Sequence, residues 1–180
     1  MEKQNWKENR PLAYVVLVVA VLIGVFGIGG AKARGVANRV NIDYQDMIAN
    51  DLALRAAAAE SIVTVGETAL GRDAASVQSA QKALTALNEA RSPARACAAN
   101  AQLTAAVGML YEETRLVTGD EKGSVLQTQW SEFLSRGNII DRSADAYNSQ
   151  VRAAAKKLSG FPASLVSALA GAHVEEFTAP

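Results

Sequence analysis

The sequence predicts an all-α protein with a single N-terminal transmembrane helix, followed by an antiparallel four-helix bundle with one very long C-terminal helix. Three observations support this fold class. Residues 12–31 form an uncharged apolar run, and residues 126–158 show an unbroken helical periodicity. After the run, no alternation of apolar and polar residues bounded by hairpin turns occurs. Aromatic residues make up only 6% of the chain and alanine is abundant, which favours helices over a sheet.

The apolar run has the length and composition of a membrane-spanning helix. Its twenty residues cover about 30 Å at the helical rise, which is the thickness of the hydrocarbon core of a bilayer. Twelve of these positions are Leu, Ile, Val or Phe, and each favours insertion by about 0.3–0.6 kcal/mol. We therefore divide the chain into an N-terminal tail over residues 1–11, a transmembrane helix over residues 12–31 and a helical domain over residues 32–180.

A cleaved signal peptide is the alternative interpretation of this run. Ala31, Lys32 and Ala33 match the small-x-small pattern of a cleavage site. The apolar part of a signal peptide usually spans about 7–15 residues, so the length of the run favours an uncleaved anchor.

The charges on either side of the run do not set its orientation, because the positive-inside rule finds equal counts. The flanking cations are Lys3, Lys7 and Arg10 before the run and Lys32, Arg34 and Arg39 after it. We expect a single-pass protein of the cell membrane with a short tail inside and an extracytoplasmic domain.

Small residues recur along the apolar run at helical spacing. They are Ala13, Ala20, Gly24, Gly27 and Ala31. Such a stripe lets a second helix backbone approach closely, so it predicts self-association or a membrane partner. Gly and Ala are also common in membrane helices that have no partner.

The rest of the composition excludes several function classes. Lys plus Arg and Asp plus Glu number 18 each, and no basic cluster occurs, so we expect no nucleic-acid partner. His173 and Cys97 are the single residues of their types and belong to no spaced ligand cluster, so we expect no metal and no cofactor. Cys97 has no neighbouring histidine that could activate it. We expect no catalytic residues and no enzyme activity.

The clearest periodicity lies late in the chain and predicts one helix from about Ser124 to Leu158. Apolar or small residues follow a 4-3-4-3 spacing typical of a bundle seam about 50 Å long. The seam consists of Leu126, Trp130, Phe133, Gly137, Ile140, Ala144, Tyr147, Val151, Ala154 and Leu158.

Three further helices are expected upstream, the first over residues 36–70, running on from the membrane helix with Gly35 as a flexible point. Gly71 to Asp73 separate it from the next helix, with Asp73 as an N-cap. The seams of the other two helices are separated by a break at Pro93, and residues 118–123 form a turn between two glycines. These seams are Val77, Ala80, Leu84 and Leu87, then Ala99, Leu103, Ala106, Val107, Leu110 and Val117. Short connections favour antiparallel neighbours.

The end of the long helix carries a distinct motif. Tyr147 lies on the seam, so its hydroxyl needs a buried partner, and Asn148 lies beside the seam, where its amide can reach another helix or a loop. We expect Gly160 to close the helix in the left-handed conformation, and Phe161 to fold back onto the last turn. Pro162 prevents continuation and can begin a short helix, with Leu165, Val166 and Leu169 inward and Gly171 ending it.

The Tyr147-Asn148 pair, Val151 and the Phe161-Pro162 pair resemble the C-terminal signature of the LemA family. The resemblance covers residues 125–177, and Ala154-Ala155 stand where the family usually repeats Tyr-Asn, as in a divergent member. The family implies a single-pass membrane protein of bacteria or archaea with an N-terminal apolar helix and a helical bundle. It supplies no biochemical activity.

Two functions fit these observations. The first is a membrane-anchored, non-catalytic scaffold or protein-interaction module of the bacterial cell envelope. The alternative is a bundle that holds a peptide or small amphipathic ligand in a groove beside the long helix, near Ala144 and Ala154, where the side chains are small.

Overall fold

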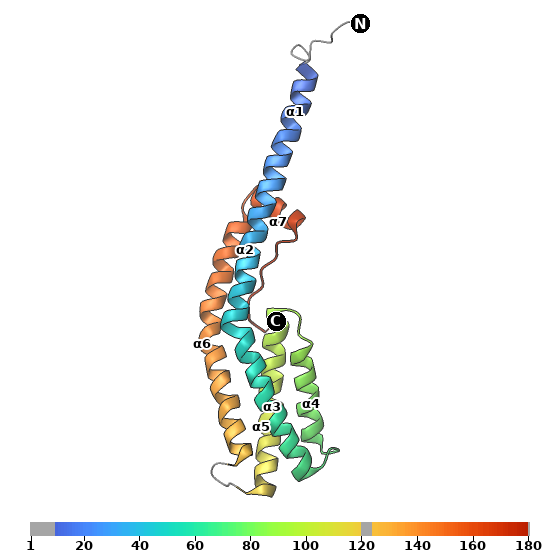
Figure 1. The fold of residues 1–180 in the computed structure, drawn as a ribbon, viewed down its shortest axis with the longest axis vertical. Helices are drawn as coiled ribbons and strands as arrows, with labels where there is room; N and C mark the ends of the chain where they lie inside the picture. The colour runs from blue at the N-terminus through green and yellow to red at the C-terminus, as the bar shows by residue number, and fades with distance from the viewer. Residues whose placement is uncertain (1–9, 120–123, 180) are drawn as a thin grey trace. The chain divides into compact units, whose positions relative to one another are not determined.

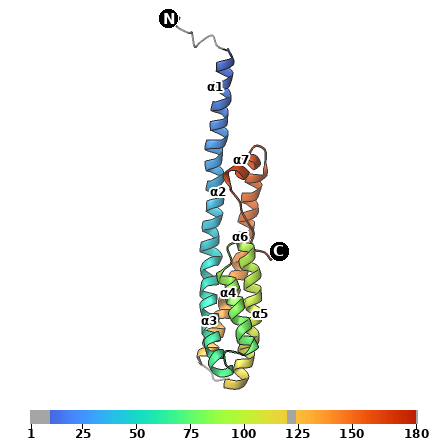
Figure 2. The same ribbon diagram turned by 90° about the vertical axis from the view of Figure 1, so that its right-hand side faces the viewer.

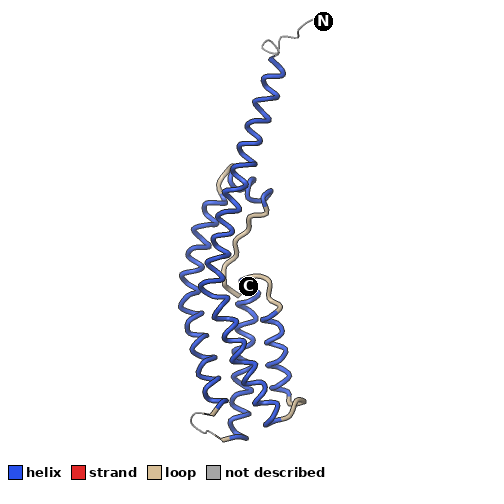
Figure 3. Tube along the Cα trace, viewed as in Figure 1, coloured by secondary structure: helices blue, strands red, loops and turns tan. Residues whose placement is uncertain are grey.

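The computed structural model describes residues 10–119 and 124–179. Within these ranges the regular structure is entirely helical and contains no strand (Figure 3). The all-α prediction is therefore confirmed for the described residues. The chain forms two compact units. The membrane-proximal unit comprises Met1–Val40 and Ala153–Val174, and the distal unit comprises Asn41–Arg152 and Glu175–Pro180.

The first helix is the longest among the described residues, and its helical structure continues from Arg10 to Leu70. It is divided by two π-helical turns into α1 (Arg10–Leu22), η2 (Ile23–Ile28), α2 (Gly29–Tyr44), η3 (Gln45–Ala49) and α3 (Asn50–Leu70). It passes through Gly35 without a break, so the expected continuation of the apolar helix into the first helix of the domain is confirmed. Arg10 and Pro11, which were expected in the N-terminal tail over residues 1–11, belong to α1. Residues 1–9 lie outside the described part.

Four more helices follow within the described residues. They are α4 (Ala75–Asn88), α5 (Pro93–Thr118), α6 (Val125–Ser159) and α7 (Ala163–Ala170). The long helix predicted over residues 124–158 is thus confirmed to within one residue at each end. Most of the turn predicted over residues 118–123 lies outside the described residues.

The start of the first helix has the character that the sequence predicts. It is long and apolar enough to cross a membrane, and it is the one described helix that meets this criterion. The side chains from Ala13 to Ile23 are exposed and do not contribute to a core: Tyr14 is 68% exposed and Leu17 is 60% exposed. A helix that is apolar all round and uncovered by protein fits a lipid environment.

In the distal unit, α3, α4 and α5 pack against one another (Figures 1 and 2). Side chains of α3 and α5 also reach α6: Arg55 donates to the carbonyl oxygen of Phe133, and Tyr111 stacks on Trp130. Phe133, Ile140 and Tyr147 of α6 are at most 1% exposed, which confirms the predicted seam. The α4 seam is also buried, and so is the α5 seam through Leu110. Val117 is 63% exposed, so its assignment to the α5 seam is wrong, because α5 ends one residue later and its last turn leaves the core.

The ends of the helices agree with the sequence in part. Ser92 caps α5, accepting a hydrogen bond from the amide of Arg95 at 3.5 Å, with Pro93 in the first helical position. Asp73 is not the N-cap of α4, because that place is taken by Ala74, whose side chain accepts no hydrogen bond. Gly71 ends α3 with φ +89°, a conformation that favours glycine.

The end of α6 lies in the membrane-proximal unit and differs from the prediction. Gly160 is not in the left-handed conformation, since the positive-φ glycines among the described residues are Gly71, Gly119 and Gly171. Phe161 is 89% exposed and so does not fold back onto α6. Both expectations are wrong because Pro162 leads directly into α7 as its N-cap, so the chain turns without a glycine cap.

The short helix α7 is present as the sequence predicts, and Gly171 ends it at φ +66°. Only one of its three expected core residues is buried. Val166 is 4% exposed, whereas Leu165 and Leu169 are 49% and 69% exposed. One side of α7 packs on the protein, and its two leucines remain on an uncovered side.

Candidate functional site

Tyr147 anchors the segment that follows α7 in the distal unit. Its side chain is 1% exposed, and its hydroxyl donates a hydrogen bond to the carbonyl oxygen of Glu175 at 2.8 Å. The ring of Tyr44 lies 5.6 Å away, centroid to centroid. Burial, followed by the influence of Tyr44 and Glu175, raises the pKa of Tyr147 to about 12. The hydroxyl therefore acts as a neutral hydrogen-bond donor.

Asn148 holds the same segment by its backbone. Its Nδ2 donates to the carbonyl oxygen of Phe177 at 3.2 Å, and its Oδ1 accepts from the amide of Phe177 at 2.7 Å. The side-chain amide thus pairs with both main-chain groups of one residue, as a neighbouring strand would. The Tyr-Asn pair lies within a helix because its two side chains bind the non-helical segment that follows α7.

Side-chain contacts complete this binding site, which we call the tail clamp (Tyr44, Tyr147, Asn148 and the bound residues Glu175–Phe177). Phe177 is 5% exposed and its ring lies 6.4 Å from that of Tyr44. At the rim, Glu176 pairs with Arg152 at 3.1 Å, and Glu175 accepts a hydrogen bond from Ser92 at 3.0 Å. The clamp therefore combines sequence-independent backbone contacts with one aromatic anchor.

Arg55 is a buried cation that the sequence analysis missed. It is 4% exposed, and each of its nitrogens finds a neutral acceptor: the Phe133 carbonyl at 3.2 Å, Asn100 Oδ1, and Thr104 Oγ1 at 3.1 Å. Its guanidinium also lies 4.1 Å from the centre of the Phe133 ring. Arg55 therefore joins α3 to α5 and α6.

Burial lowers the pKa of Arg55, and Asp141 opposes that shift; an arginine stays charged nonetheless. Gly137 on α6 makes room for the guanidinium, because a Cβ there would lie 3.0 Å from its Cζ and Nη2. The signal in the sequence was the isolated charge within the apolar stretch Leu52–Ala59. Its partners could not be identified without knowing which helices meet there.

A groove of about 250 Å³ opens on the distal unit. Its lining includes neither Ala144 nor Ala154, the two residues named in the sequence-based prediction of a groove. The lining residues are Tyr44, Gln45, Ala49, Leu52, Ala53, Leu87, Asn88, Ala90 and Ala96.

In the membrane-proximal unit, α7 docks on the first helix through small residues. A Cβ at Gly29 would lie 3.3 Å from Val166, and one at Gly30 would lie 3.8 Å from Ala170. Ala33 is 6% exposed within this contact. Larger residues at these places would push α7 away from the helix, so the glycines at the end of the apolar run make this contact.

The five residues of the predicted small-residue stripe are not the residues of the first helix that contact α7. Some of them lie beside that contact. Ala13 and Ala20 are exposed. Gly24 lines one groove beside α7, and Gly27 and Ala31 line another. The residues that form the closest approach are Gly29 and Gly30, which the predicted stripe did not contain.

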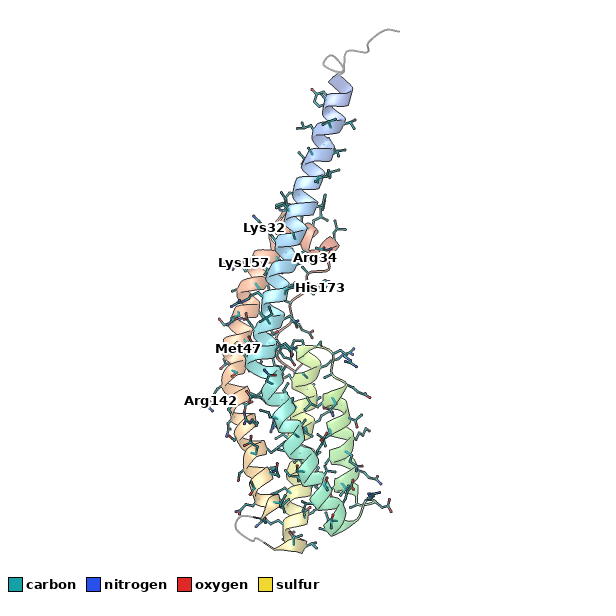
Figure 4. The ribbon with its side chains drawn as sticks, viewed as in Figure 1. Lys32, Arg34, Met47, Arg142, Lys157 and His173 are labelled. Atoms are coloured by element: carbon teal, nitrogen blue, oxygen red, sulfur yellow. The ribbon has the colours of Figure 1, made fainter. Side chains whose placement is uncertain are left out.

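The groove that contains Gly24 is named here the lysine groove. It has a volume of about 330 Å³, and its exposed surface is mostly apolar. Its two cationic side chains are Lys32 of α2 and Lys157 of α6, both labelled in Figure 4. The lining residues are Gly24, Val25, Gly29, Lys32, Ala33, Val36, Lys157, Leu158, Pro162, Ala163 and Val166.

His173 and Cys97, the candidate metal and redox residues, belong to no ligand cluster in the described part of the chain. Among residues 10–119 and 124–179, no group of three or more His, Cys, Asp or Glu side chains converges on a point. His173 is exposed. Cys97 is half-buried, and burial, its largest influence, raises the pKa of its thiol. A raised pKa lowers the fraction of reactive thiolate.

No protein-family model, no curated protein and no solved structure matches this chain.

Proposed function

We propose that this protein is a single-pass membrane protein of the cell envelope, and that its helical domain is a non-catalytic scaffold or interaction module. The observation that carries the proposal is the apolar helix over residues 12–31, whose side chains are exposed from Ala13 to Ile23. Helical structure continues from it to Leu70. The twenty residues from 12 to 31 suit the hydrocarbon core of a bilayer. The domain is proposed to lie outside the cytoplasm.

Anchoring by an uncleaved helix is favoured over a cleaved signal by the docking of α7. Cleavage after Ala33 would remove Gly29, Gly30 and Ala33, which are the residues that Val166 and Ala170 pack against. The buried face of α7 would then lose its partner. A segment that completes a folded unit is unlike a signal peptide, which is discarded.

The distal unit is proposed to be an antiparallel four-helix bundle of α3, α4, α5 and the first part of α6. The packing of α3, α4 and α5 on one another supports this, as do Arg55, which contacts α5 and α6, and the stacking of Tyr111 on Trp130, with centroids 4.4 Å apart. Short connections between these helices agree with antiparallel neighbours.

We also propose that the chain is a divergent member of the LemA family. The Tyr147-Asn148 pair that suggested the resemblance has a structural task in the tail clamp, which gives a physical reason for its presence. The proposal rests on residues 125–177 alone.

A scaffold needs a surface for its partner, and the described residues offer one candidate. Leu116 and Val117 at the end of α5 and Val125 at the start of α6 are 79%, 63% and 61% exposed. Apolar side chains gathered at one end of a domain are typical of a protein contact.

Photo-crosslinking in intact cells tests the scaffold proposal. A photoreactive phenylalanine replaces Leu116, and Lys82, an exposed polar position on α4, carries the same probe as the matched control. We expect a discrete adduct from position 116 that position 82 does not give. Equal, background-level adducts from both positions would refute the proposed contact surface.

Ligand binding in the groove between Tyr44 and Ala96 is the second candidate. Small side chains and one aromatic residue line it, which fits an apolar segment of a peptide. Titration with an amphipathic helical peptide should shift the NMR amide signals of Ala53 and Ala90 and leave that of Leu116 unchanged. Uniform or absent shifts would eliminate this candidate.

Orientation requires a reporter other than Cys97, because that thiol is half-buried and its pKa is raised. A chain with Cys97→Ala and Lys82→Cys carries its single thiol on an exposed position. A membrane-impermeant maleimide should label it in intact cells if the domain is extracytoplasmic. Labelling only after lysis would reverse the proposed orientation.

A further inference from the structure

The lysine groove lies at a definite level along the first helix. Gly24 and Gly29 belong to the proposed span of residues 12–31, whereas Val36 lies beyond its end. From Gly24 to Val36 the helix rises by about 18 Å. The groove therefore begins within the depth of the acyl chains and ends past the headgroups of the same leaflet.

The charged residues of the groove lie at its headgroup end. Lys32 is the first residue after the span, and Lys157 faces the same groove from α6. Neither lysine has an ion-pair partner among the residues that the structure describes. Lysine stems lie along apolar surface while their ammonium groups stay in the polar layer, where they attract anionic lipid.

The apolar surroundings agree with this depth. Phe161, Leu165 and Leu169 of the membrane-proximal unit are 89%, 49% and 69% exposed. Since α7 contacts Gly29 and Gly30, these side chains lie level with the end of the span. In water they would form a costly apolar patch, whereas the interfacial layer of a bilayer accepts them.

We propose that the lysine groove binds one anionic phospholipid. An acyl chain lies along Gly24, Gly29 and Val166, and the phosphate lies between Lys32 and Lys157. The volume of about 330 Å³ is at the small end of ligand pockets, which span about 300–1,000 Å³, and suits one chain of a lipid. This inference rests on the proposed membrane anchoring.

The test compares lipids that differ only in headgroup. Full-length protein is purified in detergent from membranes supplied with equal amounts of phosphatidylglycerol and phosphatidylcholine of identical acyl chains, and retained lipid is counted by native mass spectrometry. We expect one phosphatidylglycerol per chain in preference to phosphatidylcholine. The Lys32→Gln/Lys157→Gln variant should reduce that preference by on the order of tenfold, since each lysine near the surface contributes to anionic binding.

The matched control removes two exposed cations from the distal unit, Lys82→Gln/Arg91→Gln, and should keep the preference. A separate variant, Val36→Trp, fills the groove and should lower retention of both lipids while leaving the lysines in place. Equal retention of both lipids by the unaltered chain, or an unchanged preference in the Lys32→Gln/Lys157→Gln variant, would overturn the inference.

Membrane extraction of the same variants separates this inference from the proposed function. If the unaltered chain resists alkaline carbonate but shows no lipid preference, the groove proposal fails and the anchor stands. If carbonate releases the chain, both fail.

Discussion

The two units of this protein are built from different kinds of contact. The distal unit buries large side chains, with Phe133, Tyr147 and Leu103 at most 1% exposed. In the membrane-proximal unit, the buried hydrophobic residues of the contact with α7 are Ala33, Val166 and Ala172. A cluster of small residues supplies little hydrophobic stabilisation in water, so the distal unit gains more stability from its own core than the membrane-proximal unit does.

Polar side chains also differ between the units. In the distal unit they cross between helices: Arg55 reaches α5 and α6, and Arg136 pairs with Asp51 at 2.9 Å. In the membrane-proximal unit, the polar contact between α2 and α7 is exposed: Arg34 donates to the carbonyl oxygen of Ala170 at 3.2 Å. Substitutions should therefore cost most in the distal unit.

The largest effect is expected for Tyr147→Ala. The change removes a buried ring and the hydrogen bond to Glu175, so it should lower the free energy of unfolding by about 3–4 kcal/mol. Tyr147→Phe is the matched control and should cost about 1 kcal/mol, because it loses the hydrogen bond alone. Chemical denaturation in detergent measures both. Equal losses for the two variants would show that the ring is not part of the core.

Arg55→Ala should be the next most destabilising change, at about 2–3 kcal/mol. It leaves Asn100 and the Phe133 carbonyl buried without their donor. Arg55→Lys should recover less than half of the loss, since an ammonium group cannot reach three acceptors in a plane. Full recovery by lysine would mean that charge alone, and not the fork of donors, joins the helices.

Alkaline pH should weaken the distal unit selectively. The pKa of Tyr147 is raised to about 12 from the ordinary value of 10, so the folded state holds its proton more tightly than the unfolded state. The stabilisation is present below pH 10 and is lost between about pH 10 and pH 12. Tyr147→Phe should flatten the pH dependence of the melting temperature across this window. If the melting temperature of Tyr147→Phe falls with pH as steeply as that of the unaltered chain, Tyr147 is not the cause of the pH dependence.

A small gain in stability is expected for Thr114→Val. The hydroxyl of Thr114 is buried and has no hydrogen-bond partner among the described residues, and a buried hydroxyl without a partner is unfavourable. The isosteric change should raise the free energy of unfolding by up to about 1 kcal/mol. Ser76→Ala gives the contrast, because that hydroxyl donates to Glu113 and its loss should destabilise.

The smallest effect is expected in the membrane-proximal unit, for Gly160→Val. Gly160 has no positive φ, and a Cβ there would meet nothing within 4 Å. The melting temperature should change by less than the experimental error of its measurement. This corresponds to a change in the free energy of unfolding of less than about 0.5 kcal/mol. Gly171→Val is the control and should destabilise, because its φ is +66° and a β-branched residue resists that conformation.

The sequence predicted the parts of the fold that depend on local pattern. The seam of α6 and the start of α5 at Pro93 follow from periodicity and backbone chemistry, which a single chain segment determines. The conformation of Gly160 and the exposure of Phe161 were mispredicted, because Pro162 favours a new helix over a glycine cap. Local chemistry allowed both outcomes.

The candidate sites were less predictable, because each joins residues distant in the sequence. The expectation that Asn148 reaches a loop or helix is confirmed, but the sequence did not identify its partner Phe177, which lies 29 residues away in the segment after α7. The lysine groove is lined by Lys32 and Lys157, which are 125 residues apart in the sequence. Only the packed structure brings these residues together.

The proposed membrane anchor is tested most directly by washing cell membranes with alkaline carbonate. The N-terminus of the chain that remains in the pellet is then identified by mass spectrometry. We expect the protein in the pellet, with residues 12–31 still attached and release only by detergent. Protein in the carbonate wash, or a chain that starts at Arg34, would contradict an uncleaved transmembrane helix.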